Sequence, residues 1–74
     1  MKVYLIGHEY SRSMFFGGFG WVVLGIVETK EQALEACISG DHFYIEWELG
    51  QVLNSGNLLE KAHLDGNMVF PKRT

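Results

Sequence analysis

The sequence predicts an α+β protein in which a small antiparallel or mixed sheet of four to five strands carries one amphipathic helix on one face. Three observations support this class: apolar segments that suit strands near the N-terminus, a helix-capping pattern after them, and a later alternation of apolar and polar residues. The expected order is ββαβ followed by a C-terminal hairpin. The 74 residues have room for one domain, 1–74, because a second core needs roughly 50 residues of its own.

The first two strands are expected at Lys2–Ile6 and Trp21–Glu28, which are rich in β-branched and other apolar residues. In Lys2–Ile6, Val3 and Leu5 point to one face and Tyr4 and Ile6 to the other, so both faces of this strand carry apolar side chains. We therefore expect this strand to be central in the sheet. Gly25 within the second strand indicates a bulge or a close backbone contact. Between the two strands, glycines in His8–Gly20 predict a long loop or a wide hairpin tip.

A helix should begin after Thr29, because Thr29 and Gln32 form a capping-box pattern. Gly40 is the residue expected to end this helix. The helix should bury one apolar stripe, made of Ala33, Leu34, Cys37 and Ile38.

The third strand shows the clearest alternation in the chain. One face carries Phe43, Ile45, Trp47 and Leu49, and the other carries His42, Tyr44, Glu46 and Glu48. If the first strand lies between the second and third, the helix joins two parallel strands across it and packs on the sheet. We expect the face with Tyr44, Glu46 and Glu48 to be the one open to solvent.

Beyond Gly50 the sequence patterns that predict secondary structure are weaker. Leu58–Leu64 fits a strand or one helical turn, and Asp65-Gly66 is a favoured two-residue hairpin turn. We therefore predict a terminal hairpin of Leu58–Leu64 with Asn67–Phe70, stopped by Pro71.

The net charge and the cysteine content exclude several classes of protein. The net charge of −3 and the pI near 5.5 argue against a protein that grips nucleic acid through its phosphates. Cys37 is the single cysteine, which excludes an intramolecular disulfide and suits a reducing cytoplasm. The apolar start is too short for a signal peptide, and the uncharged stretch Ser13–Val27 is shorter than the about 20 residues of a spanning helix. We expect a cytoplasmic protein that does not bind a membrane.

No motif of catalysis or cofactor binding stands out. His8, His42, His63 and Cys37 lack the short spacings of structural zinc sites. Gly17, Gly18 and Gly20 precede a strand, whereas a phosphate loop precedes a helix. Glu46 and Glu48 share a strand face as paired catalytic carboxylates do, but a solvated face is the preferred interpretation. We predict no enzyme activity, no catalytic residue, no metal and no cofactor.

Three segments together resemble the small uncharacterised ββαβ proteins of bacteria and their phages. They are Val3-Tyr4-Leu5, the run Leu24–Ala33 with its Gly-hydrophobic pair and Thr-Lys-Glu-Gln-Ala helix start, and Phe43–Leu49. The resemblance covers about the first two thirds of the chain, while the loop Met14–Gly20 and the part after Leu53 depart from it. It implies the fold and a phage or mobile-element context, and transfers no catalytic residue.

The glycine-rich loop combines aromatic residues, Met and Arg, which are the types enriched in interface cores. Its phenylalanines either anchor a partner or fold back into the core, and both interpretations stay open. The predicted partner-binding residues are Tyr10, Arg12, Phe15, Phe16, Phe19, Glu46 and Glu48.

The predicted function is a non-enzymatic protein-binding module, an inhibitor of a host or defence protein of the anti-CRISPR kind that acts by steric occlusion in the host cytoplasm. Two alternatives are kept: a self-assembling homodimer that uses exposed aromatic residues or an unpaired sheet edge, and a weak single-stranded nucleic-acid binder.

Overall fold

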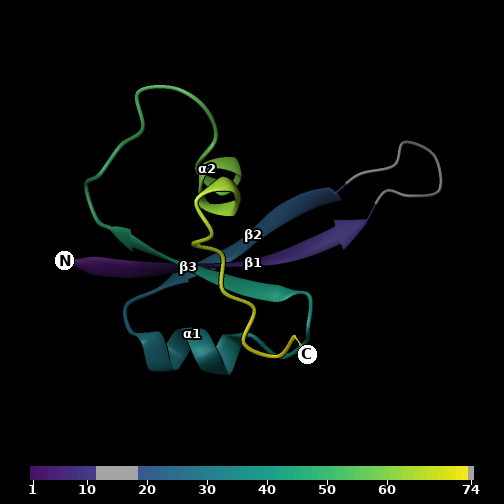
Figure 1. Cartoon of the computed structure of the whole chain (residues 1–74). Helices are drawn as coiled ribbons and strands as arrows, with labels where there is room; N and C mark the ends of the chain where they lie inside the picture. The colour runs from purple at the N-terminus through teal and green to yellow at the C-terminus, as the bar shows by residue number, and fades with distance from the viewer. Residues whose placement is uncertain (12–18, 74) are drawn as a thin grey trace.

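A computed structural model of the chain describes residues 1–11 and 19–73 (Figure 1). The elements in this part of the chain are β1 (Lys2–Ser11), β2 (Phe19–Val27), α1 (Lys30–Ala36), β3 (His42–Glu48) and α2 (Leu58–Leu64). The strands form an antiparallel sheet in the order β2-β1-β3, so the α+β class and the central position of the first strand are confirmed. The described sheet has 3 strands, fewer than predicted, with two helices instead of one. Neither described helix is long and apolar enough to cross a membrane.

β1 pairs with both neighbours, which makes β2 and β3 parallel to each other across it, as α1 requires. Both β1 and β2 extend further than predicted, into the segment expected to be a loop: β1 continues to Ser11 and β2 begins at Phe19. The pairing of β1 with β2 shifts where Ile6 faces Gly25 and Gly7 faces Val23. Leu24 is therefore the extra residue of a bulge beside Gly25, as the glycine indicated.

The capping box at the start of α1 is confirmed. The Gln32 backbone N–H donates to Thr29 Oγ1 at 3.1 Å, and the Thr29 N–H donates to Gln32 Oε1 at 3.1 Å. The helix ends earlier than expected, at Ala36 with Cys37 as its C-cap, so Gly40 does not end it. Ile38 lies beyond this end and is 77% exposed, and Leu34 is 41% exposed.

The two helices lie on opposite faces of the sheet (Figure 1). Ala33 of α1 and Cys37, its C-cap, pack against Ile6 and Tyr44. The expectation that Tyr44 faces solvent is therefore wrong: its face is the one that α1 covers, although Glu46 and Glu48 further along β3 stay exposed.

The other face of β3 is covered by the C-terminal third of the chain. Phe43 and Ile45 are 0% and 1% exposed and pack against Ala62 of α2. Partly buried residues complete this cluster: Leu5, Trp21, Leu58, Leu59, Met68 and Phe70. The cluster ends before Leu49, which is 60% exposed and so departs from the predicted apolar face.

The predicted terminal hairpin is wrong, because Leu58–Leu64 forms α2. Its residues are mostly good helix formers and include no β-branched side chain. Asn57 Oδ1 accepts from the Leu59 N–H at 2.8 Å at the N-terminus. At the other end, Gly66 has a φ of 74° and the Asn67 N–H donates to the Ala62 carbonyl at 2.8 Å, the bond of a Schellman cap. Asp65-Gly66 thus ends a helix.

One bridge remains of the expected last strand. The Tyr44 N–H donates to the Val69 carbonyl at 2.9 Å, and the Val69 N–H donates back at 3.0 Å. The C-terminal segment therefore lies beside Tyr44 on the outer side of β3.

Candidate functional site

β2 is the edge strand that the described chain leaves open. Its inner side pairs with β1, and no backbone group within residues 1–11 and 19–73 pairs with its outer side. Phe19–Val27 contains neither a charged residue nor proline. Lysine, proline and bulges are the common protections of edge strands, and β2 has only the bulge at Leu24.

Aliphatic side chains are exposed along this strand. Val22 is 45% exposed, Val23 47%, Leu24 56% and Ile26 63%. Val22 and Val23 point to opposite faces of the sheet, since neighbouring strand residues alternate. We call these four side chains and the outer backbone of β2 the β2 edge surface. It offers unpaired backbone groups flanked by apolar side chains on both faces, which is the arrangement that accepts a further strand.

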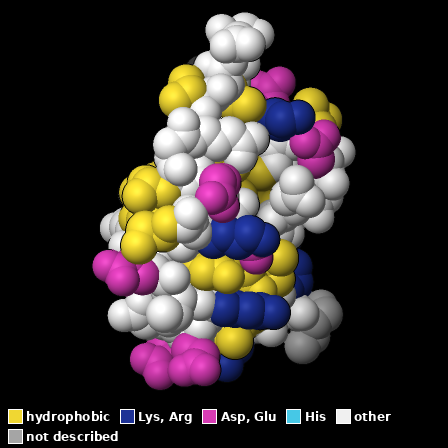
Figure 2. Space-filling model, turned by 90° about the vertical axis from the view of Figure 1, so that its left-hand side faces the viewer, with side chains coloured by type: hydrophobic (Ala, Val, Ile, Leu, Met, Phe, Trp, Pro, Cys, Tyr) yellow, Lys and Arg dark blue, Asp and Glu magenta, His cyan; other side chains and the backbone are white. Residues whose placement is uncertain are grey.

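The predicted acidic residues lie elsewhere and already have partners within the chain. Glu46 Oε1 accepts from Lys2 Nζ at 2.7 Å, and Glu48 Oε1 accepts from the N-terminal amine at 2.7 Å. The hydrogen bond and the charge of Lys2 lower the pKa of Glu46, and Glu46 raises the pKa of Lys2 in return. Figure 2 shows the side of the molecule seen from the left of Figure 1, where acidic and basic side chains are interspersed with hydrophobic ones.

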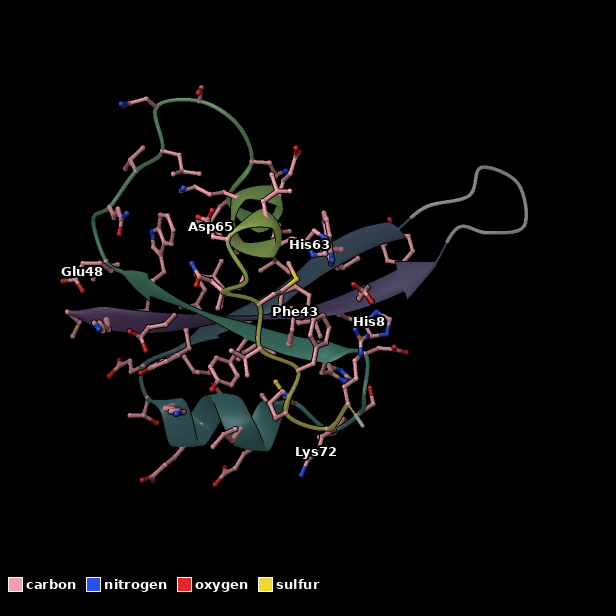
Figure 3. All side chains as sticks on the ribbon, in the orientation of Figure 1. His8, Phe43, Glu48, His63, Asp65 and Lys72 are labelled. Atoms are coloured by element: carbon pink, nitrogen blue, oxygen red, sulfur yellow. The ribbon has the colours of Figure 1, made fainter. Side chains whose placement is uncertain are left out.

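The structure does not bring the two halves of the predicted site together. Glu48 pairs with Lys2 at the start of β1, whereas Tyr10 lies eight residues further along the same strand, about 26 Å away. Figure 3 shows Glu48 at one end of the sheet and His8 toward the other.

At the second end, Tyr10 is half-buried and its ring lies over Gly20 of β2, where an added Cβ would collide with the phenol group. Phe19 pairs with Ser11 as the first residue of β2. Arg12, Phe15 and Phe16 lie outside the described residues.

The histidines form two separate contacts. His8 and His42 face each other across β1 and β3 with ring centroids 5.4 Å apart, and Ser39 Oγ lies 2.6 Å from His42 Nδ1. His63 of α2 packs on Trp21, 5.3 Å between ring centroids. Cys37 is buried beneath α1, and burial raises the pKa of its thiol. Within the described part of the chain, no three His, Cys, Asp or Glu residues are placed to hold one metal ion.

The β2 strand was predicted from the sequence, but the exposure of its aliphatic side chains was not. A strand that is apolar on both faces is usually covered on both, so its composition does not by itself predict that Val22 and Ile26 are exposed. What the sequence does not show is how little of β2 is covered: the small buried residues Ala33 of α1 and Cys37, its C-cap, pack mainly on Ile6 and Tyr44 at the centre of the sheet.

Comparison of the chain with protein-family models, with curated proteins and with solved structures gave no match. The resemblance to small ββαβ proteins therefore stays a prediction from the sequence motifs.

Proposed function

We propose that this protein is a non-enzymatic protein-binding module and that the β2 edge surface is where its partner docks. The observation that carries the proposal is the open, uncharged outer side of β2 with exposed aliphatic residues on both faces. An extended segment of a partner adds to the sheet as a further strand: its backbone pairs with the free N–H and C=O groups of β2, and its side chains cover Val22, Leu24 and Ile26. Covering each half-exposed aliphatic side chain contributes on the order of 1 kcal/mol.

The aromatic segment predicted to anchor a partner joins this surface directly, because Phe19 is the first residue of β2. Phe15 and Phe16 stay in the proposal as partner-binding residues on their residue type and sequence position alone. Glu46 and Glu48, neutralised by Lys2 and the N-terminal amine, have a smaller part in it.

The finer part of the proposal is an inhibitor, encoded by a phage or mobile element, that occludes a host or defence protein in the cytoplasm. Its support is the resemblance of Leu24–Ala33 and the two flanking motifs to small ββαβ proteins of that origin.

The test is capture of a partner by immobilised wild-type protein and by three variants. Ile26→Lys and Leu24→Lys place a charge on the β2 edge surface, while Val52→Lys changes an aliphatic residue that is 80% exposed and lies outside it. We expect one defined protein to be retained by wild type and Val52→Lys, from lysate with or without nuclease treatment, and to be lost from both β2 variants. Equal retention by all four proteins, or retention that needs intact nucleic acid, would contradict the proposal.

A further inference from the structure

We infer that the chain that docks on the β2 edge surface is a second copy of this protein, with the two β2 strands paired antiparallel about a two-fold axis. This inference rests on the proposed docking role of the surface, and it replaces an external partner there by a second copy, since one strand edge accepts one strand. The two sheets then continue into one, with β2 of each copy at the centre.

The chemistry of the surface favours a second copy. The partner strand that best complements this surface is unpaired on one side, uncharged, and apolar on both faces, and such strands are rare on folded proteins because they aggregate. β2 itself meets all of these conditions. A two-fold axis perpendicular to the sheet brings two identical strands together in antiparallel orientation and joins like faces, so the interface is self-complementary.

The charges near β2 permit this pairing. With full overlap of the 9 residues of each strand, Val23 lies at the axis and Val22 lies opposite Leu24 of the second copy. The first charged residue after the strand is Glu28. The two Glu28 residues are then at opposite ends of the pair, about 33 Å apart along the strands, so no like charges meet.

The other edge of the sheet is blocked at Tyr44 for the same pairing. Both backbone groups of Tyr44 on β3 are bonded to Val69 of the C-terminal segment. Among the described strands, β2 is the edge without such a bridge, so extension of the sheet is directed there, and pairing of β2 with β2 about a two-fold axis stops at two copies.

The test is the mass of the protein in solution, measured by sedimentation equilibrium from low micromolar to millimolar concentration. We expect the mass to rise from 8.4 kDa to twice that value and no further. Ile26→Lys and Leu24→Lys should weaken the dimer at least about tenfold, whereas Val52→Lys should dimerise as wild type does. Far-UV circular dichroism checks that each variant is folded, and Ile26→Thr, which keeps the β-branched shape, replaces a lysine variant that is not.

Hydrogen exchange gives a second measurement on the unaltered protein. Dimerisation should slow the exchange of amides in Val22–Ile26 as concentration rises, with no change at α1. A mass of 8.4 kDa at every concentration would overturn the inference, as would equal weakening by Val52→Lys.

These outcomes separate the inference from the proposed function. A monomer that still captures a different protein through Ile26 and Leu24 retains the docking role and excludes the second copy. If the protein is a monomer and captures no other protein, both the second-copy inference and the proposed docking function are wrong.

Discussion

Gly7 faces the ring of Phe43, the most deeply buried aromatic side chain of the core. A Cβ at this position would lie 2.8 and 2.9 Å from the Cε atoms of that ring and nearer still to Cζ. Gly7→Ala should therefore displace Phe43 and lower the free energy of unfolding by about 1–3 kcal/mol. Urea denaturation measures the change.

Gly25 is the matched control in the neighbouring strand, since a Cβ there meets nothing within 4 Å. Gly25→Ala should alter stability by no more than about 0.5 kcal/mol. Equal losses in the two variants would show that the contact of Gly7 with Phe43 is not what makes alanine costly.

Cys37 is 0% exposed, and burial raises the pKa of its thiol, so little reactive thiolate is present near neutral pH. We expect a disulfide reagent to modify Cys37 slowly in the native protein and fast in denaturant. With a reagent that releases a coloured thiolate, the absorbance followed over time in both conditions gives the two rates of modification. Similar rates in the two conditions would place the thiol at the surface.

The pair Lys2–Glu46 links β1 to β3, and its contribution depends on pH. Because the pKa of Glu46 is lowered, its stabilising effect is present above the ordinary carboxyl pKa and is lost as pH falls through the lowered value. Because the pKa of Lys2 is raised, its amine stays charged and the ion pair persists until the pH is strongly alkaline. Lys2→Met should slightly lower the melting temperature near neutral pH, and this effect should disappear as the pH falls through the lowered pKa of Glu46.

Both side chains of this pair are largely exposed, so the effect is small and screened by salt. Lys72→Met is the control, since Lys72 forms no ion pair with the residues described. An effect of Lys2→Met that persists in acid would mean that lost packing of the side chain, and not its charge, is responsible.

α2 depends on its caps, because a helix of 7 residues is too short to be stable alone. Asn57→Ala removes the acceptor for the Leu59 N–H and should cost about 1 kcal/mol, with a loss of helical circular dichroism. Asn54→Ala, in the same exposed polar stretch, should change neither quantity. If the two variants behave alike, the Asn57 cap does not stabilise α2.

Arg73 connects parts of the whole molecule that are distant in sequence. Its guanidinium donates to Glu9 Oε1 at 3.0 Å and to the Gly40 carbonyl at 3.1 Å, and lies 3.8 Å from the centre of the Phe70 ring. Arg73→Ala should lower the unfolding free energy by about 1 kcal/mol, measured by urea denaturation. Lys72→Ala, one residue earlier, should leave the free energy of unfolding unchanged. A similar loss in that variant would show that the contacts of Arg73 do not stabilise the fold.

Local signals predicted much of this fold. The strands near Lys2–Ile6 and Trp21–Glu28, the capping box at Thr29, the bulge at Gly25 and the alternation in β3 are all present. Each of these depends on residues close in the chain, whose backbone preferences and hydrogen bonds act before any distant contact forms. The order β2-β1-β3 also followed from residues, because Lys2–Ile6 is apolar on both faces as a central strand should be.

Tertiary contacts decided the rest, because the same local pattern serves more than one arrangement. Asp65-Gly66 suits a hairpin turn and a helix end equally, and the packing of Ala62 on Phe43 and Ile45 selects the helix. Alternation in β3 defines two faces without saying which one α1 covers, so Tyr44 was assigned to solvent although it lies in the core. The exposure of the β2 edge surface has the same origin: the residue types of β2 are visible in the sequence, whereas its open outer side exists only once the sheet is assembled.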